Sequence, residues 1–235
     1  MSVSRRNLLH SSVAAGAALV GARIVAAQPH TGHGAPTPQP PAPMIPPPPP
    51  VPRARKVPGG YTPVVVPNGS TLPFTLRAGV KVFHLTAGPV KHTFAPGLEV
   101  EAWGYNGSTP GPLIEVVEGD RVRIYVTNKL PEPTTVHWHG VLLPCGMDGV
   151  GGLTQDFILP GRTFKYEFTF TKPGTFMYHP HFDEMTQIAL GMVGMIVVHP
   201  KRATESRPVR DYSLMTHEWK VPIGAARPDP MAMSE

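Results

Sequence analysis

The sequence predicts an all-β fold, an antiparallel Greek-key sandwich or barrel, and three observations lead to this expectation. Short apolar runs rich in β-branched and aromatic residues follow one another from residue 61 onward. Turn-forming pairs such as Asn106-Gly107 and Pro160-Gly161 separate these runs. The same region contains no convincing amphipathic helix. Seven or eight short strands at this spacing are typical of two packed sheets.

Each expected strand is an apolar run that ends at a turn signal. The expected strands cover residues 80–86, 98–105, 113–117, 121–127, 136–139, 163–170, 175–178 and 192–199. A helical turn over 184–190 is also compatible with its residues. The segment 211–219 is expected to be a further strand without partners in this chain, and such a strand would present an exposed edge.

The first 27 residues have the composition of a secretory signal. A basic start at Arg5-Arg6 precedes an apolar run over 11–22 and small residues over 25–27. The twin arginines and their surroundings resemble the export signal of the twin-arginine route. We therefore expect a bacterial protein that is periplasmic or secreted and has no integral membrane segment once the signal is removed.

The remainder of the chain divides by composition into three parts. Residues 28–60 are rich in Pro and poor in large apolar residues, so they are expected to form a disordered tether. Residues 61–200 form the predicted β-domain. Residues 201–235 are expected to contain a linker and the start of an incomplete second domain, so the chain reads as a truncated or split polypeptide.

Charge and cysteine content narrow the possible functions. The formal net charge is +5, and Arg5, Arg6 and Arg23 of the predicted signal supply three of these charges. The remainder is close to neutral, which gives no electrostatic footprint for nucleic acid. Cys145 is the single cysteine, so an intrachain disulfide is excluded. Since Cys145 has no flanking histidine, we interpret it as an inert loop thiol.

Two His-x-His pairs dominate the chemistry of the predicted domain. They are His137-Trp138-His139 and His179-Pro180-His181. Alternate residues of a strand share one face, so the imidazoles of each pair would project together, roughly 7 Å apart. Pro180 cannot donate to a ladder, which places the second pair at a strand end or edge. If the two strands are neighbours, four imidazoles converge, and such a set suits copper, zinc, iron or nickel.

Blocks around these pairs resemble, in their order along the chain, the N-terminal cupredoxin domain of multicopper oxidases. The similarity is greatest to the bacterial laccase-like and copper-resistance oxidases, and it extends over about residues 80–200. The blocks that carry it are Tyr105 to Ile114, Glu118-Gly119-Asp120, Val136 to Gly140, Met147-Asp148-Gly149, Thr154-Gln155, Pro160 to Phe168, Gly174 to His181 and Gly191 to Gly194.

The resemblance implies a cupredoxin-like (plastocyanin-like) fold and a role for each histidine. His137 would bind the type 2 copper, and His139, His179 and His181 would bind the type 3 pair. Asp148 matches a carboxylate that delivers protons to this trinuclear cluster. In the family, the complete enzyme takes electrons from a small reducing substrate, such as a phenol or Cu(I), and reduces dioxygen to water.

The resemblance also implies that the histidines form half of a site. The 235 residues contain neither a His-Cys-His block nor a His-x-x-His-x-His block, so the type 1 copper and the other cluster ligands are missing. A second cupredoxin domain or a partner chain would supply them, and this chain alone is expected to be inactive.

Several alternatives stay open at this point. The chain could be a non-catalytic periplasmic copper-binding module, or a mononuclear zinc or copper enzyme that uses only the four histidines. Asp148 could be an ordinary turn residue. Asp183 and Glu184, just after His181, could orient imidazoles or cap a short turn.

Overall fold

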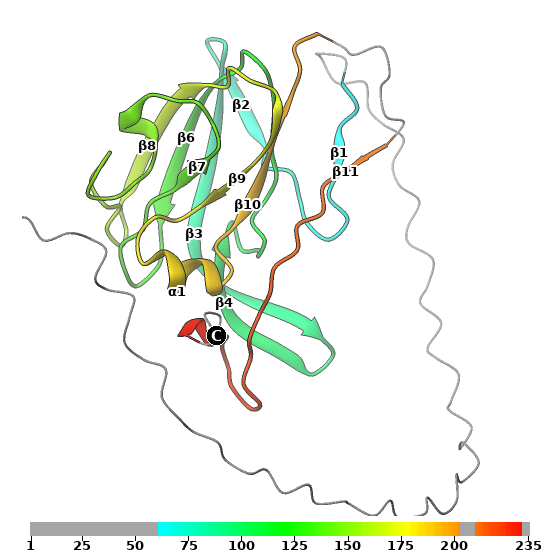
Figure 1. The fold of residues 1–235 in the computed structure, drawn as a ribbon, viewed down its shortest axis with the longest axis vertical. Helices are drawn as coiled ribbons and strands as arrows, with labels where there is room; N and C mark the ends of the chain where they lie inside the picture. The colour runs from blue at the N-terminus through cyan, green and yellow to red at the C-terminus, as the bar shows by residue number, and fades with distance from the viewer. Residues whose placement is uncertain (1–60, 203–209, 232–235) are drawn as a thin grey trace, which may run out of the picture. The chain divides into compact units, whose positions relative to one another are not determined.

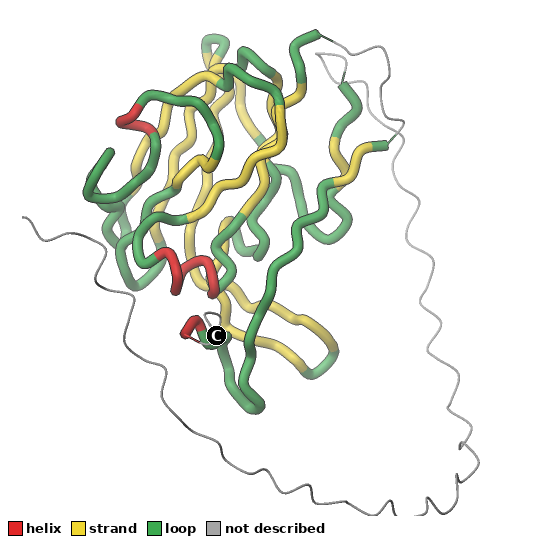
Figure 2. Tube along the Cα trace, in the orientation of Figure 1, coloured by secondary structure: helices red, strands yellow, loops and turns green. Residues whose placement is uncertain are grey.

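The computed structural model of the chain describes residues 61–202 and 210–231, which lie within one compact unit. The predicted signal (1–27) and tether (28–60) lie outside the described residues. Two β-sheets face each other in this unit (Figure 1). Helix occurs among the described residues only as short segments between strands and loops, drawn in red in Figure 2.

The two sheets differ in their number of strands and in strand order. The larger sheet has the order β2-β3-β6-β8, with β4 paired to the far part of β3, and the smaller sheet has the order β5-β10-β9-β7. A third, two-stranded sheet joins β1 to β11. The bounds are β1 Val64–Val65, β2 Phe74–Arg77, β3 Val80–Ala95, β4 Leu98–Tyr105, β5 Ile114–Val117, β6 Arg121–Asn128, β7 His137–His139, β8 Thr163–Thr169, β9 Gly174–His179, β10 Gly194–His199 and β11 Asp211–Tyr212.

The core lies between the two large sheets. It is filled by apolar side chains from alternate residues of the strands. In β6, Val122, Ile124 and Val126 are fully buried while the intervening residues are more exposed. This is the pattern of a strand with one face on the core. Trp138 comes from the opposite sheet and packs edge-on against Tyr166 of β8. Because Trp138 separates His137 from His139, its burial turns both histidines away from the core.

All eight expected strands are present, and the all-β sandwich is confirmed. The expectation of antiparallel pairing is wrong for two ladders, because β3 pairs with β6 and β5 pairs with β10 in parallel. Parallel neighbours need a crossover rather than a tight turn. In both cases, intervening strands of the chain supply that crossover. β10 begins at Gly194 rather than at residue 192, since Met192 still hydrogen-bonds back to Gln187.

Two short helices lie between strands along the chain. The predicted helical turn is confirmed as α1 (Glu184–Ala189), and the 3-10 helix η1 covers Cys145–Met147. Asp183 is the N-cap residue of α1, but its side chain makes no capping hydrogen bond. The suggestion that Asp183 caps the turn is confirmed by its position, although the cap is made by its backbone, since its carbonyl accepts from the amide of Gln187. Figure 1 shows α1 at the end of the domain, next to the chain that leaves β9.

The expectation of an unpaired strand over 211–219 is also wrong. Only Asp211–Tyr212 is a strand, and it pairs in parallel with β1. The following residues run along the same domain, and Trp219 stacks on His92 of the β3–β4 hairpin with ring centroids 5.8 Å apart. Further along, the amide of Glu101 donates to the carbonyl of Ala226. The edge is thus covered within the chain, and the start of a second domain in 201–235 stays a prediction.

The C-terminal segment predicts a pH dependence of stability. Burial lowers the pKa of His217 below its usual 6.5, and a hydrogen bond to the Ala189 carbonyl offsets part of this shift. Between the lowered value and about 6.5 the unfolded chain binds more protons, so the free energy of unfolding falls as the pH drops through this window. We expect His217→Gln to flatten this fall in urea titrations at pH 7 and pH 5. Equal slopes in both proteins would contradict the assignment.

Candidate metal centre

The pairing of β7 with β9 brings the two His-x-His motifs together. The strands are antiparallel, and His137 lies directly opposite His179. The ring of His137 is the centre of the group, with centroid distances of 5.5 Å to His139, 5.3 Å to His179 and 5.5 Å to His181. The two strands are neighbours, so the condition under which the sequence predicts convergence of the four imidazoles is met. β9 ends at His179, as Pro180 requires.

A backbone carbonyl fixes the orientation of His137. Its Nδ1–H donates to the carbonyl oxygen of Asp148 over 2.7 Å. The same ring nitrogen lies 3.5 Å from Oδ1 of the Asp148 side chain. A proton held on Nδ1 leaves the lone pair on Nε2, and this is the usual arrangement of a metal-binding histidine whose second nitrogen has an acceptor.

Gly149 makes this contact between loop and strand possible. Its φ of +84° is in the region that side chains disfavour, and an added Cβ would overlap the carbonyl of Val136 and lie 2.9 Å from Cα of His137. The loop after η1 therefore passes so close to the backbone of Val136 and His137 that no side chain fits at residue 149. Asp148 is a turn residue at the end of η1, and its carboxylate also lies beside His137. Its role in proton delivery stays a prediction.

His179 is the buried member of the group. Its side chain is 4% exposed, and its Nδ1 donates to the carbonyl of Pro180 over 2.9 Å. The free Nε2 then lies 3.1 Å from Nδ1 of His139. Burial lowers the pKa of His179 and outweighs the opposing effects of the Pro180 carbonyl and Glu184. The imidazole is thus neutral at pH 7, which is the form that binds metals.

The other two histidines lie at the rim of the site. His139 is exposed, and the side chain of His181 is 37% exposed. The backbone amide of His181 donates to Oγ1 of Thr135, over 3.1 Å. This bond attaches the segment after β9 to the residues that lead into β7. The four histidines therefore differ in solvent exposure, from the buried His179 to the exposed His139.

The donor set fits a metal ion of the borderline class. One nitrogen each from His137, His139 and His179 lie within 4.8 Å of one another. Neutral imidazoles at this spacing are suitable for copper or zinc. His181 is outside this tightest set, although its ring packs against that of His137. Sequence reasoning did not find Thr135 or Gln187, which support the site through hydrogen bonds and are recognisable only once the strands are paired.

Comparison with known proteins shows the family to which this chain belongs. A family model described as multicopper oxidase matches residues 86–203, about half of the chain. The chain belongs to the multicopper oxidase family. A copper resistance protein A homolog of Pseudomonas syringae pv. tomato is 37% identical over 139 residues. Copper resistance protein A of Escherichia coli is 36% identical over 137 residues.

A solved structure gives the same assignment. The multicopper oxidase of Pseudomonas thermotolerans superposes with a TM-score of 0.54 at 40% identity, and the match covers 56% of this chain and 32% of that one. The predicted cupredoxin-like fold is therefore confirmed. Both curated relatives match 58% of this chain, but the chain covers only 23% and 22% of their lengths. It spans about a quarter of the relatives it matches.

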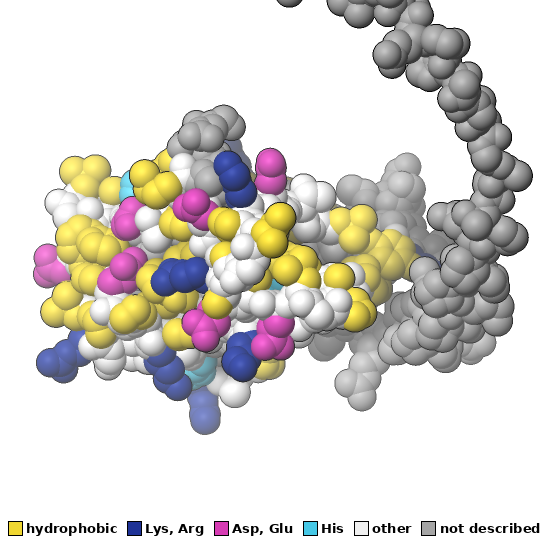
Figure 3. Space-filling view, turned by 90° about the horizontal axis from the view of Figure 1, so that it is seen from below, with side chains coloured by type: hydrophobic (Ala, Val, Ile, Leu, Met, Phe, Trp, Pro, Cys, Tyr) yellow, Lys and Arg dark blue, Asp and Glu magenta, His cyan; other side chains and the backbone are white. Residues whose placement is uncertain are grey.

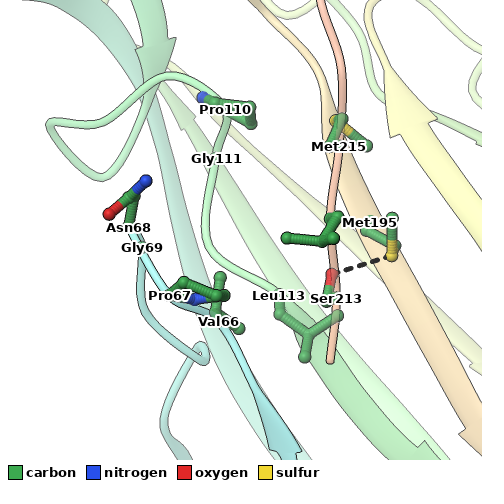
Figure 4. A pocket seen from close by; sticks show the side chains of 11 residues that line it. Val66, Pro67, Asn68, Gly69, Pro110, Gly111, Leu113, Met195, Ser213 and Met215 are labelled. Carbon is green, nitrogen blue, oxygen red and sulfur yellow. Dashed lines mark hydrogen bonds between the residues drawn. The ribbon is translucent and has the colours of Figure 1, made fainter. Parts of the chain in front are cut away.

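Cys145 and a cavity are two other features of this multicopper oxidase chain. Cys145 is exposed on η1. A cavity of about 120 Å³ lies where the turn after β1 meets the segment that follows β11 (Figure 4). There the hydroxyl of Ser213 donates to Sδ of Met195, and none of the four histidines contributes to the lining.

Two further observations concern the surface charges and the helices of the described residues. On the face shown in Figure 3, Lys and Arg side chains alternate with Asp and Glu among hydrophobic ones rather than gathering in one patch. Within residues 61–202 and 210–231, no helix has the length and apolar character needed to span a bilayer.

Proposed function

We propose that this chain is the copper-binding N-terminal domain of a multicopper oxidase and carries half of its trinuclear copper site. In this proposal His137 is a ligand of the type 2 copper, and His139, His179 and His181 are ligands of the type 3 pair. The observation that carries the proposal is the orientation of His137 and His179. Each donates from Nδ1 to a backbone carbonyl and so keeps Nε2 unprotonated, with a lone pair that can bind a metal.

The residues of this chain would have three tasks. His137 and His179 hold fixed ring orientations before any metal arrives, which lowers the cost of ordering the site. His139 and His181, at the rim, face outward to where further ligands must come from. Bound copper would supply one-electron redox chemistry and an acceptor site for dioxygen. Asp148, with its carboxylate 3.5 Å from His137 and partly exposed, would hold and pass protons beside this centre.

Exposed apolar residues support a partner domain. Leu142, Leu153 and Leu159, between β7 and β8 in the chain, are 57%, 81% and 54% exposed, and Met185 on α1 is 63% exposed. Large exposed apolar side chains are typical of a surface that another domain covers. We propose a second cupredoxin domain, in the same or a partner chain, as that occupant. It would bring the type 1 copper and the remaining cluster histidines.

The proposal for the complete protein follows from these parts. It would oxidise a phenol or Cu(I) by single electrons and reduce dioxygen to water, in the periplasm or outside the cell after twin-arginine export. This chain alone would be inactive as an oxidase. The sequence contains no His-Cys-His block to form the type 1 site that receives the electrons.

The test is complementation of the full chain by the missing domain. We expect copper-loaded chain alone to give an ordinary type 2 spectrum without the intense blue absorption, since that band requires a copper–cysteine thiolate bond. Adding a cupredoxin domain that carries the His-Cys-His block should raise copper content and produce dioxygen consumption. A Cys145→Ser variant serves as the control and should behave identically.

Three outcomes would count against the proposal. A blue band from the chain alone would require a ligand role for Cys145. Copper binding that no added domain converts into dioxygen consumption would favour a non-catalytic copper-binding module. Tight binding of one zinc ion with hydrolytic activity would favour a mononuclear enzyme, for which the three close imidazole nitrogens are a sufficient set.

A further inference from the structure

We propose that Glu184 is a positioning residue of the metal centre, whose single carboxylate holds the imidazoles of His179 and His181 in a fixed mutual arrangement. The inference rests on the proposed copper site and adds a residue to it. Among the described residues, Glu184 is the only carboxylate within 4.0 Å of two imidazoles. Its Oε1 lies 3.5 Å from Nδ1 of His179, and its Oε2 lies 3.7 Å from Nε2 of His181.

The two imidazoles need such a link because their environments differ. His179 is buried and already donates to the Pro180 carbonyl. His181 is 37% exposed, and its imidazole has no hydrogen bond to another of the described residues. Its ring is 6.3 Å from that of His179 and is not part of the tightest nitrogen cluster. Glu184 is therefore the described polar group that restrains the His181 side chain, and it does so from the first turn of α1.

The helix that carries Glu184 is itself firmly attached to the other histidine strand. Gln187, one turn later, is fully buried. Its Oε1 accepts from the hydroxyl of Thr134 over 2.7 Å, and its Nε2 donates to the Pro133 carbonyl over 2.8 Å and to the Glu132 carboxylate over 2.7 Å. These partners lead directly into β7. A carboxylate on so short and well-anchored a helix has a defined position rather than a mobile one.

The backbone around α1 agrees with a position set by the site. Asp183, the residue between the His181 segment and the helix, has a φ of +38°, which is uncommon for a non-glycine residue. The residue that follows this turn is Glu184, whose carboxylate lies near both imidazoles. An acidic residue at a helix start is stabilised by the helix dipole in any case. The dipole, however, does not account for two imidazoles within reach of the same carboxylate.

The test compares Glu184→Gln with Asp183→Asn in the full chain. Both changes remove one negative charge, at adjacent positions, and Asn tolerates the positive φ at 183. Among the described residues, no imidazole nitrogen forms an ion pair with the Asp183 carboxylate. We expect Glu184→Gln to weaken binding of Cu(II) by about 10–100-fold, the usual range for partners that orient metal ligands. It should also alter the EPR hyperfine pattern, while Asp183→Asn changes neither.

A second readout uses the metal-free protein. Nitrogen-15 NMR of the histidine rings should show changed signals of His179 and His181 in Glu184→Gln and unchanged ones in Asp183→Asn. Thermal unfolding of both variants should match the parent, which separates positioning from loss of fold.

Each remaining outcome decides one of the two proposals. Parent-like Cu(II) affinity and ring signals in Glu184→Gln would overturn the inference, as would equal effects of both variants. If the parent chain binds no copper, the proposed function fails, and the metal-free ring signals still decide whether Glu184 positions the histidines.

Discussion

Uptake of copper by the full chain is expected to fall from about one ion to none when His137 and His139 are both changed to Ala. His137 has ring contacts with the other three histidines, so its loss removes the centre of the donor set. His139 supplies the nitrogen that lies closest to His179. A single imidazole from each of His179 and His181 then remains, which is too few to hold the ion against water and buffer.

The stoichiometry of about one ion follows from the number of ligands. A type 3 pair would place two cations face to face with only three imidazoles between them, and their repulsion is strong where water is excluded. One ion can instead share the three nitrogens that lie within 4.8 Å of one another. We therefore expect a single type 2 copper in the parent chain and very little oxidase activity.

Metal analysis of dialysed protein is the measurement for this prediction. Cys145→Ser is the matched control, because Cys145 is exposed on η1 and the change should leave the uptake intact. Three coppers per chain with dioxygen consumption would contradict the half-site proposal. Association of two copies, each providing four imidazoles, would then have to replace it, and sedimentation of the loaded protein would detect that association.

The convergence of the histidines could be predicted because it depends on local rules. Strand alternation turns His137 and His139 to one side, and the burial of Trp138 confirms which side faces the core. Pro180 correctly indicated the end of β9. The register that sets His137 opposite His179 is a property of two strands far apart in the chain. Only the resemblance to a family made that pairing the expected one.

The missed elements lack such local signals. β1 has two residues and is held by β11 and by the carboxylate of Glu115, which accepts from the amide of Val64. All four residues of β2 are exposed, so no buried face marks it as a strand. The parallel ladders depend on crossovers between sheets, and apolar periodicity is the same in parallel and antiparallel pairs at this length. These features come from the tertiary fold and not from any window of sequence.

The role of Gly149 could likewise not be read from the sequence, where it follows Asp148 as an ordinary turn glycine. In the fold it lies against the backbone that leads from Val136 to His137. The Asp148 carbonyl reaches Nδ1 of His137 only because nothing but a hydrogen atom stands between the loop and the strand. One glycine therefore couples the turn chemistry of the loop to the orientation of a proposed copper ligand.

We expect Gly149→Ala to lower the free energy of unfolding by about 2–4 kcal/mol, because a methyl group would overlap main-chain atoms that cannot move aside. The positive φ of +84° adds to this cost. If the variant still folds, the loop must retreat from β7, and the Asp148 carbonyl then loses its bond to His137. Copper affinity should fall by about 10–100-fold in addition.

Gly146→Ala is the matched control three residues earlier. Its added Cβ meets no atom within 4 Å, and its φ is not in the positive region, so both stability and copper affinity should stay close to those of the parent. Urea unfolding and copper titration of the two variants measure the difference. If Gly149→Ala kept the parent stability and copper affinity, the close approach of the loop to β7 would not be what orients His137, and the Asp148 carbonyl would lose its assigned role. The comparison is sharp because both substitutions add one methyl group to the same loop, and only one of them meets the backbone of a histidine strand.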